Sequence, residues 1–163
     1  MVSQKKESSS LSLRIFMNDI KICIREINRS EPVGVICHCC LKDPLPFYGM
    51  GELILKIDRL CDDMGFPEAS PERRTLHSRM KEKEGLHFYH DFKEFGVMKG
   101  EIFAIFITLR YRQNVSWQGS VHFSGDATVY QFRSVLELMG FMMEKFEELG
   151  GQGGEYARET VES

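Results

Sequence analysis

Residues 101–150 combine three segments that alternate apolar and polar side chains with one amphipathic helical segment. Between residues 102 and 112, one face of an extended chain collects Phe103, Ile105, Ile107, Leu109 and Tyr111. Such alternation is typical of a half-buried strand. Residues 116–123 alternate in the same way, and residues 128–132 form a short third segment. The pattern predicts an antiparallel meander with one apolar face.

A helix is predicted directly after the third segment. Ser134 and Glu137 fit the S-x-x-E capping box, in which each side chain satisfies a free amide of the first turn. Apolar residues then recur at helical spacing at Val135, Leu138, Met139, Met142, Phe146 and Leu149. Gly150 and Gly151 predict the end of this helix.

The same order of features occurs 85 residues earlier in the chain. Gly119 corresponds to Gly34, and Phe132 corresponds to Phe47. The helical stripe corresponds to Met50, Leu53, Ile54, Ile57, Cys61 and Met64, and Gly65 follows it as a stop signal. We therefore predict an α+β fold of two pseudo-repeated antiparallel hairpin-or-meander-plus-helix units, packed about an approximate twofold. Two unrelated units of similar length are the alternative.

These units divide the chain into a single domain with two disordered ends. The domain is expected over 11–150, with halves 11–65 and 86–150, a connection at 66–85, and disordered ends at 1–10 and 151–163. Shorter elements are predicted as strands at 11–16 and 86–92 and a polar helix at about 71–84.

Charge and composition narrow the classes of function. The formal net charge is −3, and no half of the chain is basic, which disfavours nucleic acid as a partner. The N-terminus has no apolar region of a signal peptide, and no apolar run approaches the roughly 20 residues of a membrane span. Five cysteines are an odd number, which favours a reduced, cytoplasmic setting over a disulfide framework.

Three clusters could carry metal or phosphate chemistry, and each has a simpler structural explanation. Cys37, His38, Cys39 and Cys40 include metal-ligand types, but a second pair of ligands at zinc spacing is missing from the sequence. His87-x-x-His90-Asp91 places its imidazoles on opposite faces of a strand. Gly49-Met50-Gly51 is a bare G-x-G at a helix start. We predict neither a metal, nor a cofactor, nor a catalytic residue.

An arginine-rich hairpin end is the predicted binding surface, because arginine beside tryptophan is common in recognition sites. Its residues are Arg110, Arg112, Asn114, Ser116, Trp117, Gln118 and Arg133, with Arg25 as the counterpart in the first half. A core position for Trp117 is the alternative. Asn114–Gly119 also resembles the N-x-S-x-x-G motif of PilZ domains, which bind cyclic di-GMP, and Arg25–Arg29 fits their R-x-x-x-R motif. The spacing between the two motifs departs from the PilZ pattern.

Over most of its length the chain looks like a group of short uncharacterised proteins from gram-positive anaerobic bacteria. The resemblance rests on R-Q-N-x-S-W-Q-G at 112–119, F-R-S-x-L-E-L at 132–138, and the segment from Phe47 to Pro67. It implies no activity, because none is attached to the group.

Together these observations favour a small, non-enzymatic binding or regulatory protein over an enzyme, since convergent titratable groups are not evident. The expected partner is another protein, and a homodimer through an exposed strand edge is a further expectation. Two alternatives stay open. One is a module for an anionic small ligand, such as a nucleotide or cyclic dinucleotide, and the other is a metal-dependent enzyme that uses the Cys/His cluster.

Overall fold

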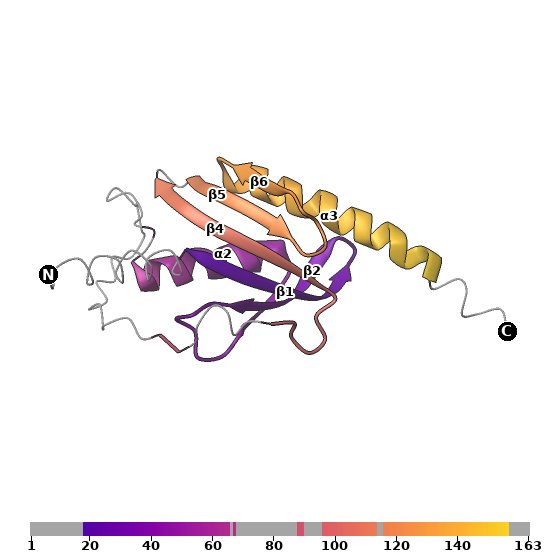
Figure 1. The fold of residues 1–163 in the computed structure, drawn as a ribbon, viewed down its shortest axis with the longest axis horizontal. Helices are drawn as coiled ribbons and strands as arrows, with labels where there is room; N and C mark the ends of the chain where they lie inside the picture. Colours follow the sequence, from indigo (N-terminus) through magenta and orange to yellow (C-terminus); the bar gives the residue numbers. More distant parts are fainter. Residues whose placement is uncertain (1–17, 66, 68–87, 90–95, 114–115, 157–163) are drawn as a thin grey trace, which may run out of the picture.

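The computed structural model (Figure 1) describes residues 18–65, 67, 88–89, 96–113 and 116–156, with only the backbone described at 113 and 151–156. Within these residues the fold is α+β, as predicted: one antiparallel sheet of six strands with two helices. The elements are β1 (Asp19–Asn28), β2 (Glu31–Cys37), β3 (Leu45–Tyr48), α2 (Met50–Met64), β4 (Phe103–Gln113), β5 (Ser116–Phe123), β6 (Val129–Phe132) and α3 (Val135–Tyr156). The predicted elements at 11–16 and 71–84 lie outside the described residues. Within 86–92 only Phe88 and Tyr89 are described, and neither belongs to a strand.

The sheet has the strand order β3-β2-β1-β4-β5-β6, so the first strands of the two halves pair at its centre. Both outer hairpins use the same register, with Gly34 opposite Phe47 and Gly119 opposite Phe132. A Cβ at Gly34 would lie 1.9 Å from the Cys23 carbonyl oxygen, and one at Gly119 would lie 2.0 Å from that of Thr108. Only glycine permits these two close backbone approaches.

A bulge interrupts the first strand of each half at equivalent positions. The register shifts between Ile24 and Glu26 in β1, and between Leu109 and Tyr111 in β4. A bulge inserts one residue and so exchanges the faces beyond it. The strict alternation predicted for residues 102–112 is therefore wrong after Leu109. Tyr111 is 57% exposed, whereas Arg112 lies opposite the buried Trp117, on the same face as the core.

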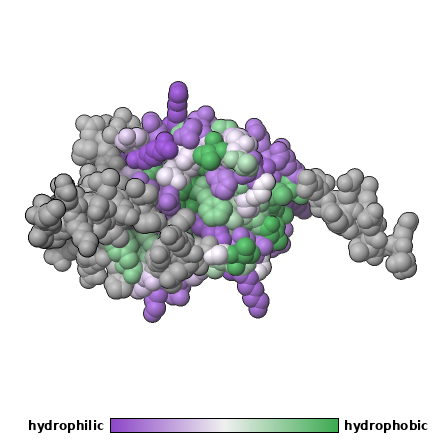
Figure 2. Space-filling view, in the orientation of Figure 1, coloured by the Kyte–Doolittle hydropathy of each residue, from purple (hydrophilic) through white to green (hydrophobic). Residues whose placement is uncertain are grey.

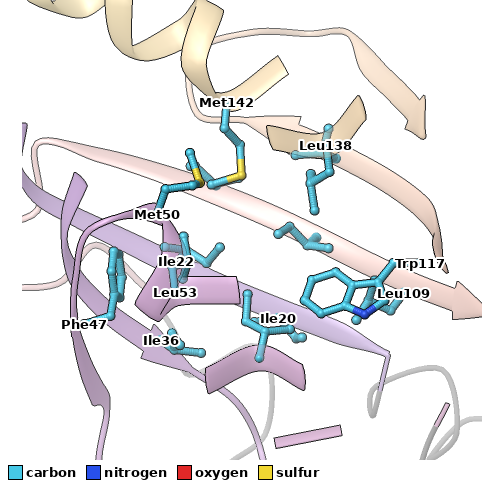
Figure 3. Packing of buried hydrophobic residues seen from close by; sticks show 14 of the residues in the cluster. Ile20, Ile22, Ile36, Phe47, Met50, Leu53, Leu109, Trp117, Leu138 and Met142 are labelled. Carbon is cyan, nitrogen blue, oxygen red and sulfur yellow. The ribbon is translucent and has the colours of Figure 1, made fainter. Parts of the chain in front are cut away.

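Both helices cover the same face of the sheet. Alternate strand residues and the stripes of α2 and α3 form one buried cluster, whose members include Ile22, Ile105, Leu53 and Met142. Figure 3 shows Met50 and Leu53 of α2 and Leu138 and Met142 of α3 together with buried side chains of the strands, such as Ile22 and Trp117. In Figure 1 the strands lie in front of α2. Burial of these apolar side chains is the main stabilising contribution to such a fold.

The start of α3 is capped as expected, but its predicted end is wrong. The Glu137 amide donates to Ser134 Oγ, and the Arg133 amide donates to Glu137 Oε2, which confirms the capping interaction. Helix α2 ends as predicted at Gly65, which adopts a left-handed φ of 65°. Gly150 does not adopt a positive φ, and α3 continues to Tyr156. Glycine ends a helix only where the backbone takes the left-handed conformation, so the predicted tail is partly helical.

The other side of the sheet, which we call the outer face, carries a different set of residues. It presents Lys21, Cys23, Val35, Cys37, Phe106, Thr108, Ser120 and His122. Polar, sulfur-containing and aromatic side chains thus alternate with the core residues along the same strands. Among the described helices, none combines the length and apolar character that a membrane crossing requires.

Candidate functional site

Rows of cross-strand neighbours assemble the candidate site on the outer face. Pairing of β2, β1, β4, β5 and β6 aligns one row, Cys37–Lys21–Phe106–His122–Val129. The adjacent row is Asp19–Thr108–Ser120–Gln131. Directly opposed residues lie about 4.5–5.5 Å apart at their Cβ atoms, so each row brings its side chains together.

The second half of the outer face contains a depression of about 390 Å³. Its lining consists of Asp19, Phe106, Ile107, Thr108, Ser120, His122, Ala127 and Val129. Thr108 Oγ1 donates a hydrogen bond of 2.6 Å to Asp19 Oδ1. Burial raises the pKa of the Asp19 carboxyl, and the Thr108 bond opposes this shift. The His122 ring stacks on Phe106 at 5.4 Å between centroids. The depression thus joins two aromatic rings, a carboxyl and two hydroxyls.

Exposed cationic and apolar side chains lie on the strands that form this depression and just beyond β6. Arg110 is exposed, and its Nη1 donates to Gln131 Oε1 at 3.4 Å. Arg133 follows β6 and is also exposed. Val129 is 55% exposed on the last strand. In Figure 2, hydrophobic residues gather near the centre of the view, and hydrophilic residues project around them.

Two of the predicted binding residues lie away from the accessible surface. Trp117 is 3% exposed and belongs to the core, which is the alternative weighed from the sequence. Arg112 is 4% exposed, and its Nη2 donates to Asp58 at 3.0 Å and Asp62 at 2.6 Å on α2. The bulge at Arg110 directs Arg112 toward α2. Both side chains therefore hold the sheet and helix together.

The remaining predicted residues are scattered. Gln118 and Arg25 are exposed, and Arg25 lies on β1, in the first half. Ser116 Oγ donates to the Arg133 carbonyl at 2.8 Å and ties β5 to the end of β6. Asn114 lies outside the described residues. Of the predicted set, the structure shows a contact between Ser116 and Arg133, and Arg110 and Gln118 lie on the neighbouring strands β4 and β5.

A segment of residues 96–102 lies against the outer face of the first half. Lys21 Nζ donates to the Gly96 carbonyl at 2.7 Å and to Glu101 Oε2 at 2.9 Å. The Lys21 and Glu101 side chains are only 2% and 7% exposed. Glu101 Oε2 also accepts from the Met98 amide, and the Ile102 amide donates to the Ile24 carbonyl. A buried ion pair costs desolvation, so its retention fixes the segment in one position.

Two cysteine sulfurs lie beneath this segment and contact its Met98. Cys23 and Cys37 are fully buried, with their Sγ atoms 3.8 Å apart, and Cys37 Sγ donates to Met98 Sδ at 3.1 Å. The contact between the two thiols lowers the pKa of Cys37 and, together with burial, raises the pKa of Cys23.

The turn after β2 gathers a second group, His38, Cys39 and Cys40. Their ligand atoms all lie within 4.8 Å of one another, which could hold a metal ion. The contact with Cys40 and then that with His38 lower the pKa of Cys39 to about 5 against the effect of burial, and the pKa of Cys40 is raised. However, His38 Nδ1 already accepts a hydrogen bond from the Cys40 amide at 3.1 Å, so a metal ion bound through Nδ1 would compete with this bond.

Several of these features could not be found by reading the sequence. Asp19, Ser120 and His122 meet only because the register of three strands aligns them. Lys21 and Glu101 lie 80 positions apart. Lys21 interrupts an otherwise apolar strand, and this interruption indicates a partner, because a buried lysine requires one.

Comparison of the chain with protein-family models, curated proteins and solved structures gave no match. The bacterial resemblance therefore stays a prediction, and function has to be argued from the site itself.

Proposed function

We propose that this protein is a non-enzymatic binding protein that recognises an acidic segment of a protein partner at the second half of its outer face. Arg110 and Arg133 supply the positive charge, and the depression beside them accepts an apolar side chain. Val129 and Phe106 form the apolar part of that depression. Arginine and aromatic residues around a pocket are the usual energetic centre of such interfaces.

The observation that carries this proposal is the charge of the rim. Within the described part of the chain, neither Arg110 nor Arg133 takes part in an ion pair, whereas the buried Arg112 has two aspartates. Exposed guanidinium groups match carboxylates in a bidentate geometry. An acidic segment would therefore complete the charge balance of the rim.

We further propose that the two halves are copies of one unit related by an approximate twofold axis through the β1–β4 pair. Equal hairpin registers, equal bulge positions and equal glycine contacts support this. In addition, Glu52 Oε2 accepts the Tyr48 amide as Glu137 accepts the Arg133 amide. Under this proposal, one scaffold carries two different outer surfaces.

Quantitative capture from the native host tests the proposed surface. The full chain serves as bait in parallel with the charge-reversed variant Arg110→Glu/Arg133→Glu. We expect the variant to lose the specific partners of the wild type. Partners bound to the wild type should be released as the salt concentration is raised, because surface ion pairs are screened. Arg59→Glu, at an exposed position of α2, is the matched control and should capture the same partners.

Two results would contradict this proposal. One is an identical set of partners for wild type and the charge-reversed variant. The other is recovery of partners whose contact segments, mapped by cross-linking, carry no acidic residues. Sedimentation of the free chain at several concentrations separates the predicted homodimer from a heterologous complex.

A second candidate function is binding of an anionic small ligand, such as a nucleotide. It is favoured by the volume of the depression, which falls within the ~300–1,000 Å³ of small-molecule sites. Thermal stabilisation by a nucleotide panel that disappears in Arg110→Ala would support it. Absence of any shift across the panel would leave the protein partner as the ligand.

A further inference from the structure

Two cysteine sulfurs of the first half and the Met98 sulfur of the segment 96–102 form a site that the proposed function does not use. Cys23 and Cys37 come from neighbouring strands, and Met98 comes from the segment 96–102. All three pack together with Val35 in a small cluster separate from the main core. We propose that Cys23, Cys37 and Met98 are a three-coordinate binding site for a soft monovalent metal ion, Cu(I).

The distances suit such an ion. The two thiol sulfurs are 3.8 Å apart, and a triangle with sides of that length has its centre about 2.2 Å from each corner. This is close to a metal–thiolate bond of about 2.3 Å. Met98 Sδ lies 3.1 Å from Cys37 Sγ, so the thioether must move outward by several tenths of an ångström. Methionine has the rotational freedom for this movement.

The donor set selects the metal. Two thiolates and one thioether are soft ligands, which favour Cu(I) over magnesium, calcium or manganese. Structural zinc sites use four ligands from Cys, His and carboxylates, and a thioether is not among them. The described cluster therefore offers too few zinc ligands but a complete trigonal set for Cu(I).

The surroundings hold the site in place and set a cation beside it. Cu(I) binding displaces the two thiol protons, which leave to solvent. Two thiolates with one Cu(I) then carry a net charge of −1, and Lys21, the direct cross-strand neighbour of Cys37, shares its positive charge between this site and Glu101. Glu101 binds both Lys21 and the Met98 amide, so the ion pair positions the third ligand. Met98 is only half-buried, which gives an entering ion a route past its side chain.

Anaerobic titration of the reduced full chain with Cu(I), in competition with a Cu(I) chelator, tests the site. We expect one Cu(I) per chain and a first shell of three sulfurs by X-ray absorption. Cys23→Ala and Cys37→Ala should weaken binding by more than about 100-fold, above the loss typical of outer-shell partners. Met98→Leu, which conserves volume, should remove one sulfur from the shell and weaken binding by at least about tenfold.

Matched controls lie elsewhere in the same chain. Cys61→Ala and Met64→Leu change buried sulfur residues of α2 and should leave binding unchanged. Cys39→Ser/Cys40→Ser removes the competing cluster and should also leave it unchanged. If the Cys23 or Cys37 variant does not fold, the site is tested by the Cu(I) affinity of Met98→Leu and by the number of sulfur ligands in its X-ray absorption spectrum. The proposal is overturned if the wild type binds no stoichiometric Cu(I), if nitrogen appears in the first shell, or if only the Cys39/Cys40 variant loses the metal.

Discussion

The two halves of this molecule have the same order of three strands and one helix, and they differ in the chemistry of the outer face. At positions 85 residues apart, Lys21, Cys23, Val35 and Cys37 in the first half stand against Phe106, Thr108, Ser120 and His122 in the second. The first set is buried under residues 96–102, whereas the second lines an open depression. One arrangement of strands thus supports a closed sulfur cluster in one half and an accessible polar pocket in the other.

The two halves also differ in how the first strand contacts a helix after its bulge. Arg112 of the second half reaches α2 of the first half, where Asp58 and Asp62 accept its hydrogen bonds. Its counterpart Ile27 packs against the core as an apolar side chain. The scaffold therefore tolerates an ion pair or an apolar contact at one position, provided the bulge before it turns the side chain inward.

The largest effect is expected from the closed half. Lys21→Met leaves the Glu101 carboxylate buried without its cation, which should lower the free energy of unfolding by about 3–5 kcal/mol. Lys21→Met/Glu101→Gln, in which the amide oxygen can still accept from Met98, should recover much of this loss. Chemical denaturation measures both. Equal loss in the single and double variants would mean that the ion pair does not position the segment.

The same ion pair gives the closed half a pH dependence. Burial raises the pKa of Glu101, but the bonds from Lys21 and the Met98 amide outweigh it and hold the pKa below its usual range. The stabilisation is therefore present above the unfolded pKa of about 4.3 and is lost as the pH falls through the lower folded value. Denaturation curves from pH 3 to pH 7 should show this loss in the wild type and a smaller one in Lys21→Met/Glu101→Gln.

The equivalence of the halves is tested by one methyl group in each. Gly34→Ala and Gly119→Ala place a Cβ about 2 Å from a backbone carbonyl oxygen, so each should destabilise the fold by about 1–3 kcal/mol or more. Gly51→Ala, on the exposed side of α2 with no atom within 4 Å of the added Cβ, is the control and should not destabilise. A large loss of stability in only one of the variants Gly34→Ala and Gly119→Ala would contradict the equivalence of the two halves.

Two nearby arginines separate a structural cation from a binding one. Arg112→Met should cost about 1–2 kcal/mol, less than a fully buried pair, because Asp62 is partly solvated. Arg110→Met should change stability by less than about 0.5 kcal/mol. In capture experiments the order should reverse, with Arg110→Met losing partners and Arg112→Met keeping them at temperatures where it is folded.

The smallest effect is a titration confined to the first half. Cys39 corresponds to Ser124, so a thiolate with a pKa of about 5 is expected only at the end of β2. Ultraviolet thiolate absorbance should rise through that pH in the wild type and not in Cys39→Ser. Cys61, whose pKa burial raises to about 12, provides the contrast.

Much of the fold was accessible from the sequence, because periodicity reports which face of an element is buried. The α+β class, the helix start at Ser134 and the core stripes follow from spacing alone. The bulge at Arg110 could not be read, since an inserted residue leaves no compositional mark, and it reversed the faces of Tyr111 and Arg112. Gly150 has the identity of a stop signal but not the backbone conformation. The depression depends on register between three strands, which no local pattern contains.

Amide hydrogen exchange of the full chain, alone and bound to its captured partner, tests most directly whether the second half of the outer face is the binding surface. We expect new protection around the depression, in β5 and β6 near His122 and Val129, with α2 and the strands that carry Cys23 and Cys37 unchanged. Protection on α2 or α3, with β5 and β6 unaltered by the partner, would contradict it.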